Sequence, residues 1–263
     1  LFKADRPAFE TKWRDLGVFV KYGMVSDTKF MDRAMNFALL ANTDKEHFLI
    51  PDYKEKIKDN QTDKHDKTVC IYTQDPDGNH SLIQAAKNRG YDVLLMDTVL
   101  DNHWMQHLEY RSELGLVFVR IDSDTLDKLV QKEEEKKSVL SEKEVEKVKA
   151  AFEKAVGENK GATVQCSPLA PDDHPVSITK PEFMRRMKEM QALHGMGMGD
   201  FPDTYNVVVN TNHPLVAEKL AGLKKSKEQA ELAQYLYDVA LLQQGMLRGE
   251  ALTQFVSTTL GRL

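Results

Sequence analysis

Apolar runs the length of single strands alternate with helix-like segments through the first half of this chain. The runs cover residues 69–73, 92–97 and 116–121, and between them residues 79–89 and 101–110 carry apolar side chains at helical spacing. The order is therefore strand, helix, strand, helix, strand. Such an order predicts a small three-stranded parallel sheet with right-handed crossovers and helices on its faces. We expect a compact α/β/α subdomain here.

The segments on either side of this subdomain have different patterns. Apolar residues recur at helical spacing over residues 1–50, which predicts a mainly helical segment, and the polar residues 51–66 indicate a short helix or a loop. Residues 128–160 hold similar numbers of lysines and glutamates. That balance is typical of a solvated helix with ion pairs at four-residue spacing. A domain boundary is expected near residues 124–138.

The second half of the chain mixes the two kinds of element, so its expected class is α+β. Short β-rich runs and longer amphipathic segments alternate irregularly there. The predicted strands are residues 162–166, 176–178 and 205–209. The predicted helices are residues 180–194, 213–222, 226–244 and 249–262, and the last two form a helical hairpin.

Length and composition exclude several classes of protein. A chain of 263 residues suits two domains, and an apolar share of 41% allows real cores. The net charge of -5 gives no basic face of the kind that nucleic-acid binders use. No apolar run approaches the roughly 20 residues of a membrane span. With two cysteines and no signal-peptide pattern, the sequence predicts a protein of the reducing cytoplasm.

A parallel sheet invites the hypothesis of a nucleotide or metal site. No G-x-G-x-x-G or G-x-x-x-x-G-K-[ST] motif is present, and no motif for covalent catalysis occurs. Asp97, Asp122 and Asp124 follow predicted strands, where they could hold magnesium for an enzyme. Aspartates also commonly cap and turn the chain after a strand, and this second interpretation is favoured. We therefore assign no catalytic, cofactor-binding or metal residue.

Methionine is concentrated in one predicted helix and the glycine-rich segment after it. A capping box with proline in the first turn opens this helix at residues 179–182. Its apolar face has a single aliphatic residue, whereas leucine, isoleucine and valine usually dominate a core. Flexible thioethers suit a surface that accepts many partners, although a plain core helix is about equally consistent with the pattern. The face and its flank consist of Phe183, Met184, Met187, Met190 and Leu193.

The predicted hairpin at the end of the chain carries more apolar surface than one packing face requires. Each of its two helices has an apolar stripe at helical spacing. Such a hairpin suits a two-fold four-helix dimer, and packing on its own domain is about equally consistent with the pattern alone. The stripes consist of Leu232, Tyr235, Leu236, Val239 and Leu242 in the first helix and of Leu252, Phe255, Val256 and Leu260 in the second.

Four segments together resemble the bacterial form of the ninety-kilodalton heat-shock chaperones. They are KWRDLGVF with the following KYG at residues 12–23, DNHWM at 101–105, EFMRRM at 182–187 and NTNHPLV at 210–216. No single segment is a strict signature. Their order and spacing match the family over nearly the whole chain, and the ordered set is specific.

The resemblance implies a layout and a cellular role. Residues 1–124 would be the second part of the family's middle domain, and residues 125–263 the C-terminal dimerisation and client-binding domain. The ATP- and magnesium-binding domain would lie upstream of Leu1, so no catalysis is expected here and the start is interpreted as a cut inside a longer protein. The absence of an acidic tail after Leu263 fits the bacterial type. The implied role is protein folding in the stress response, with ATP hydrolysis in the full-length protein.

The resemblance also implies partners and contact residues. In the family, unfolded client proteins touch a helix of the C-terminal domain and a tryptophan of the middle domain. By position these contacts fall on Phe183, Met187, Met190 and Gln191, and on Trp104 with His103. Gln191 stands where the family often has an aromatic residue. A homodimer is implied, and other chaperones are a further implied class of partner.

Overall fold

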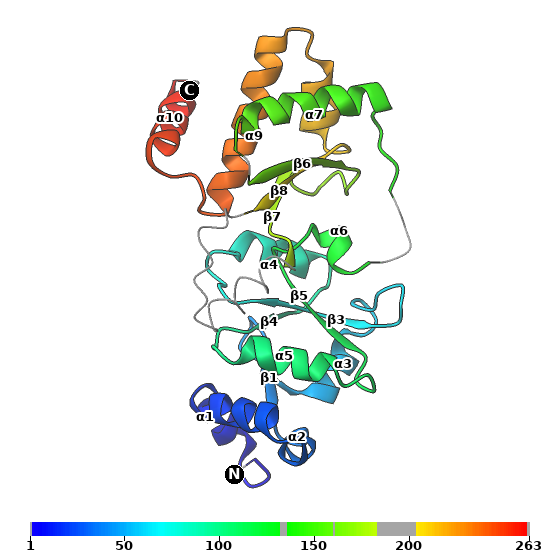
Figure 1. Cartoon of the computed structure of the whole chain (residues 1–263), viewed down its shortest axis with the longest axis vertical. Coiled ribbons are helices and arrows are strands. Elements are labelled where there is room, and N and C mark those ends of the chain that lie inside the picture. The colour runs from blue at the N-terminus through cyan, green and yellow to red at the C-terminus, as the bar shows by residue number, and fades with distance from the viewer. Residues whose placement is uncertain (1, 132–135, 160, 183–203, 262–263) are drawn as a thin grey trace. The chain divides into compact units, whose positions relative to one another are not determined.

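The chain folds into two compact units (Figure 1). The computed structural model describes residues 2–131, 136–159, 161–182 and 204–261. Unit 1 comprises Leu1–Ile121 with Lys128–Glu133, and unit 2 comprises Asp122–Asp127 with Glu134–Leu263. The assignment of residues 1–124 and 125–263 to two chaperone domains stays a prediction.

Unit 1 begins with helices and then forms a small β-hairpin. The elements are α1 (Arg6–Ser26), α2 (Thr28–Ala34), β1 (Leu39–Ala41), β2 (His47–Leu49) and α3 (Ile50–Ile57). The prediction of helix over residues 1–50 is therefore wrong for its last part. Strands β1 and β2 pair in antiparallel orientation, with Leu39 opposite Leu49. Strands of three residues are too short to show a two-residue period in the sequence.

The predicted parallel sheet is confirmed. Its strands are β3 (Thr68–Thr73), β4 (Val93–Leu95) and β5 (Leu116–Arg120), in the order β4-β3-β5 with both pairings parallel. The crossovers contain α4 (His80–Asn88) and α5 (Asp101–Glu109). All six residues of the central strand are buried, as expected for a strand covered on both faces.

One face of α1 enters the core of unit 1. Phe9, Trp13, Gly17, Lys21 and Met24 are its buried positions, spaced three or four residues apart. A side chain at Gly17 would place its Cβ 3.1 Å from the indole of Trp13, so glycine makes room for this ring. The helix starts at Asp5, whose side chain accepts a hydrogen bond from the Ala8 amide at 3.0 Å.

The charged tract of residues 128–160 contains a helix that occupies only part of it. Helix α6 (Leu126–Leu129) ends just inside the tract, and α7 spans Glu142–Val156. The second helix begins at a capping box in which Ser141 and Glu144 satisfy one another's backbone amides. A helix over the whole tract is therefore wrong, because this cap starts a new element.

Unit 2 combines a mixed sheet with helices. Strands β6 (Ala162–Ser167), β7 (Val176–Thr179) and β8 (Tyr205–Asn210) have the order β6-β8-β7, with β6 parallel and β7 antiparallel to β8. They are followed by a single π-helical segment, η1 (Leu215–Leu220), and by α9 (Ser226–Gln243) and α10 (Gly249–Leu260). The predicted combination of an α/β/α subdomain with a mixed C-terminal domain is confirmed.

The core of unit 2 lies between its sheet and the helices α7, η1 and α9. Val148 and Phe152 of α7 are fully buried there, as are Val207 and Val209 of the central strand. The Tyr237 hydroxyl of α9 lies 2.7 Å from that of Tyr205, so the two polar ends satisfy each other. None of the helices that the structure describes has the length and apolarity needed to cross a membrane.

Candidate functional site

The NTNHPLV segment has a structural role in unit 2. Asn210 is fully buried, and its side-chain nitrogen Nδ2 donates a hydrogen bond to the Ala170 carbonyl at 2.7 Å. Its side-chain oxygen Oδ1 accepts a hydrogen bond from the backbone amide of Leu169 at 3.2 Å. The side-chain nitrogen Nδ2 of Asn212 donates hydrogen bonds to the carbonyls of Lys137 and Leu169. These two asparagines therefore fix two loops beside the end of β8, because buried backbone groups need partners.

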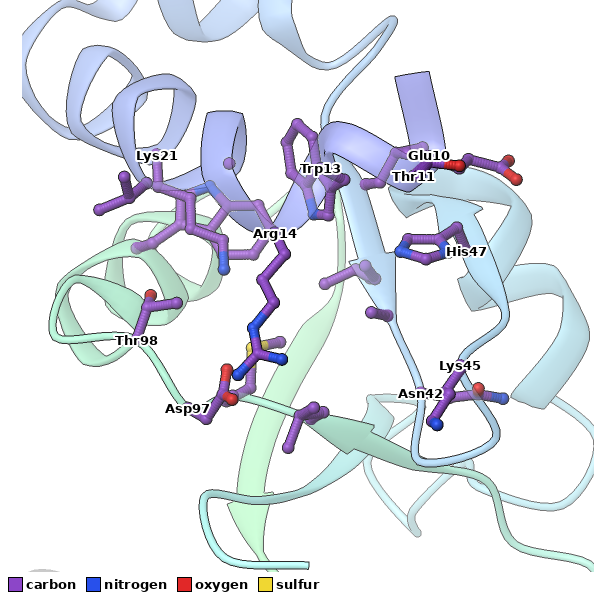
Figure 2. Close-up of a pocket in the computed structure, with 18 residues that line it drawn as sticks. Glu10, Thr11, Trp13, Arg14, Lys21, Asn42, Lys45, His47, Asp97 and Thr98 are labelled. Atoms are coloured by element: carbon purple, nitrogen blue, oxygen red, sulfur yellow. The ribbon is translucent and has the colours of Figure 1, made fainter. Parts of the chain in front are cut away.

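Unit 1 contains a cavity of about 370 Å³ between α1, β1 and the end of β4 (Figure 2). Both apolar and polar residues line it. The close-up shows Arg14 extending from α1 toward Asp97, with Asn42 and His47 on the side of the hairpin. The residues around the cavity include Trp13, Arg14, Lys21, Met96, Asp97, Thr98 and Trp104.

A buried ion pair joins two helices beside this cavity. Lys21 Nζ of α1 lies 2.5 Å from Asp101 Oδ1 of α5, and the side chain of Asp101 is fully buried. The other carboxylate oxygen of Asp101 accepts the Thr98 amide at 2.9 Å. Lys21 Nζ also lies 4.9 Å from the ring centroid of Trp104, within the range of a cation–π contact. Sequence reasoning missed this pair, although a lysine in phase with Phe9 and Trp13 was a visible signal.

The predicted client contact Trp104 is fully buried in unit 1, and His103 beside it is half-buried. The indole Nε1 of Trp104 is enclosed and makes no hydrogen bond in the described part of the chain. Trp104 is also among the residues around the cavity. Contact of these two residues with clients stays a prediction.

The other predicted client contacts lie outside the described residues. They are Phe183, Met184, Met187, Met190, Gln191 and Leu193.

The predicted dimer residues of α9 divide into two groups. Leu236 is 5% exposed and belongs to the core of unit 2, and Leu232 packs against that core. Tyr235 and Val239 are half-buried, and Leu242 is exposed. One edge of the predicted stripe therefore faces the protein's own core, and the other edge is accessible.

Helix α10 has no buried residue at all. Leu252 and Phe255 are half-buried, while Val256 and Leu260 are exposed. Its aromatic contact with α9 is the stacked pair of Tyr235 and Phe255, whose ring centroids lie 5.6 Å apart. A groove of about 500 Å³ runs between the two helices. An amphipathic helix this uncovered has an apolar face available for a partner.

The acidic side chains proposed for magnesium do not form a metal site in the described residues. No three His, Cys, Asp or Glu side chains there gather closely enough to hold a metal ion. Asp97 lies in unit 1, whereas Asp122 and Asp124 lie in unit 2. Asp122 is 5% exposed and faces Lys180 Nζ at 3.9 Å. The enzyme hypothesis therefore gains no support.

Neither cysteine is a reactive thiol. Burial raises the pKa of the Cys70 thiol strongly, and burial raises the pKa of Cys166 to about 11. Both thiols are therefore protonated near neutral pH and poor nucleophiles. Both are also free of disulfide bonds.

Comparison with known proteins identifies the family. The model of the Hsp90 protein family matches residues 2–259. A chaperone protein HtpG of Bacteroides fragilis is 42% identical over 229 residues, covering 86% of this chain and 34% of that protein. The HtpG of Porphyromonas gingivalis is 40% identical over 232 residues, covering 87% and 34%. The HtpG of Salinispora tropica is 27% identical over 262 residues, covering 92% and 39%.

The alignments cover most of this chain and a smaller part of each relative. The chain spans about a third of the length of the curated Bacteroides and Porphyromonas relatives. The family match, in contrast, covers nearly all of this chain. This protein therefore belongs to the Hsp90 family of chaperones.

Proposed function

We propose that this chain is the dimerising and client-holding part of an Hsp90 chaperone of the cytoplasm. Residues 1–124 would act as the second part of the middle domain and residues 125–263 as the C-terminal domain. ATP and magnesium would act elsewhere in the whole protein, which would couple nucleotide hydrolysis to movement of these units. The two free, protonated thiols fit a reducing compartment. The observation that carries the proposal is the uncovered α10.

The dimer follows from what α10 needs. A helix of 12 residues is marginal in water by itself and is normally held by packing of its apolar face. In this chain that face meets α9 at Phe255 and leaves Val256 and Leu260 exposed. A second copy presenting the same α9 and α10 would cover both faces in an isologous four-helix arrangement.

The client contacts would come from two places. The predicted face of Phe183, Met187 and Met190 offers polarisable, adaptable side chains that suit many apolar sequences. The second place would be Trp104 of unit 1, which is fully buried, so a client would reach its indole only after the packing around it opens. Both are apolar, as a partner with exposed apolar segments requires.

Suppression of aggregation tests the client-holding function. We expect Met187→Asp with Met190→Asp to abolish suppression of aggregation of a heat-denatured model protein, because two charges on the face oppose apolar contact. Light scattering measures aggregation, and far-ultraviolet circular dichroism verifies the fold. Val139→Asp is the matched control, because Val139 is 69% exposed in unit 2 and outside the predicted face. Unchanged suppression in the double variant would exclude the proposed client surface.

A further inference from the structure

We propose that the cavity beside α1 binds a small organic monocarboxylate with an apolar body, whose carboxylate is attracted by Arg14 and Lys45. The cavity is formed by α1, by β1 with the turn that follows it, and by the segment from β4 to α5. This inference goes beyond the proposed function, because the ligand is a small molecule and no client protein takes part.

The apolar part of the lining suits the body of such a ligand. The cavity volume of about 370 Å³ lies within the range of roughly 300–1,000 Å³ that small-molecule pockets occupy. Val18, Ala41 and Leu95 line the cavity and are only half-buried, so they have apolar surface that a ligand can cover. Removing this surface from water favours binding of a ligand with an apolar body.

Some of the charges around the cavity already have partners. The acidic and basic residues of the lining, histidine apart, are Glu10, Arg14, Lys21, Lys45 and Asp97. Glu10 forms an ion pair with Arg6 of its own helix, and Lys21 forms the buried pair with Asp101. These two lining residues therefore contribute little net charge to the cavity.

The other three charges have no ion pair with any residue that the structure describes. They belong to Arg14, Lys45 and Asp97. Figure 2 shows Arg14 extending from α1 toward Asp97, with Lys45 and His47 on the side of the hairpin. Two cations and one anion leave one positive charge in excess, and protonation of His47 would only add to it.

Lys45 is held in place by a hydrogen-bonded turn. Asn42 Oδ1 accepts the backbone amides of Asp44 and Glu46 at 3.1 and 2.9 Å, and the Asn42 carbonyl accepts the Lys45 amide at 3.0 Å. Asp44 and Glu46 are themselves paired with lysines outside the lining, so they do not compensate Lys45. The positive charge of the turn therefore remains available to a ligand.

One excess positive charge selects a monoanion. A carboxylate can accept two parallel hydrogen bonds from a guanidinium such as that of Arg14, and the Lys45 ammonium adds a third donor group. A dianion such as phosphate would bring a second negative charge near Asp97 and would gain nothing from the apolar lining. An amine would face two cations. A monocarboxylate with an apolar body uses both parts of the lining.

Isothermal titration calorimetry of the full chain tests the class of ligand. The probe is hydrocinnamate, and the matched probes with a similar body are the neutral hydrocinnamide and the cationic phenylpropylamine. We expect a saturable heat with hydrocinnamate, weaker binding of the amide and no saturable heat with the amine. Absence of a saturable heat with hydrocinnamate, or tighter binding of the amine, would overturn the proposal.

Charge variants locate the bound carboxylate. Arg14→Gln and Lys45→Gln should each weaken binding of hydrocinnamate about fivefold, because one attractive charge is lost. Asp97→Asn should strengthen binding, because it removes the opposing charge. Lys12→Gln is the matched control, since Lys12 is an exposed cation of α1 that does not line the cavity. Equal affinity in Lys12→Gln, Arg14→Gln and Lys45→Gln would overturn the proposal.

A variant that reduces the cavity tests the contact with the apolar body. Ala41→Leu places a larger side chain in the lining and should abolish binding of hydrocinnamate, with circular dichroism verifying the fold. A carboxylate held only by surface charge would bind this variant as well as it binds the chain, and that result would overturn the proposal. The charge variants keep the test decisive if Ala41→Leu disturbs the fold.

Discussion

Helices α1 and α10 are both amphipathic, but they are covered very differently. Helix α1 buries Phe9, Trp13 and Met24 in unit 1 and even places the charged Lys21 in contact with Asp101. Helix α10 has a regular apolar stripe and buries none of its residues. The comparison shows that a helical apolar pattern predicts a face that needs cover, without identifying what covers it.

The two helices also differ in what their apolar faces are expected to support: packing within one unit for α1, and association between chains for α10. The partners of α1 come from elsewhere in its own unit, and its packing contributes to the stability of that unit. The stacked Tyr235 and Phe255 attach α10 to α9, while its exposed side chains remain accessible. Substitutions in α1 should therefore affect unfolding, and substitutions in α10 should affect the mass of the assembly.

The largest expected effect comes from the buried ion pair of α1. We expect Lys21→Met to destabilise unit 1 by roughly 3–5 kcal/mol, because Asp101 would be left as an unpaired buried charge. Urea unfolding monitors this change through tryptophan fluorescence, since both tryptophans lie in unit 1.

The control for this substitution is an exposed ion pair of the same unit. Arg111→Met removes the surface contacts of Arg111 with Asp32 and Glu113, which are worth at most about 1 kcal/mol. Equal losses in the two variants would contradict the assigned role of the Lys21–Asp101 pair.

Truncation of one apolar residue in each helix gives the next largest difference. Met24→Ala in α1 should cost about 2–5 kcal/mol, because Met24 is 1% exposed and its loss leaves a cavity. Leu260→Ala in α10 should change the free energy of unfolding by less than about 0.5 kcal/mol in dilute solution, since Leu260 is 64% exposed. Urea unfolding of both variants at low protein concentration measures the difference. A large loss for Leu260→Ala under these conditions would mean that α10 is covered within its own chain.

The smallest expected effect is a change of the stability of unit 2 with pH. Burial and the nearby His174 lower the pKa of His213, and His213 Nδ1 accepts a hydrogen bond from the Leu215 amide at 3.0 Å. The unfolded chain then binds more protons than the folded chain. The stability contributed by neutral His213 is complete above the ordinary pKa of 6.5 and is lost as the pH falls below it.

His213→Asn isolates this contribution, because asparagine keeps an acceptor for the Leu215 amide and does not titrate. Urea unfolding at pH 7.5 and pH 5.5 is monitored by far-ultraviolet circular dichroism, with tryptophan fluorescence marking unit 1. We expect the variant to lose less stability between the two pH values than the chain does. An identical loss would show that His213 does not contribute to the pH dependence.

The sequence predicted the strands that stand in apolar or β-rich runs and missed those inside a segment of helical pattern. The strand Thr68–Thr73 was predictable because a fully buried parallel strand is a continuous apolar run. The hairpin from Leu39 to Leu49 was missed because its three-residue strands lie within residues 1–50, where apolar residues recur at helical spacing. The capping box at Ser141 was visible, yet the charge pattern around it favoured one long helix.

The candidate sites were less predictable for a physical reason. The contact between Lys21 and Asp101 joins residues 80 positions apart, and no local pattern encodes such a distance. Leu236 shows the same limit, since it belongs to the predicted dimer stripe and yet lies in the core of unit 2. Periodicity assigns a residue to a face, and only the folded chain shows which element covers that face.

Sedimentation equilibrium across a concentration series tests the central claim most directly. The claim is that a second copy of this chain covers α10, so the chain should show twice its mass of 30.0 kDa. Leu252→Glu with Leu260→Glu should reduce the mass to that of one chain while the circular dichroism stays unchanged, because the charges oppose burial of the apolar face. A folded chain with the mass of one copy at every concentration would contradict the account.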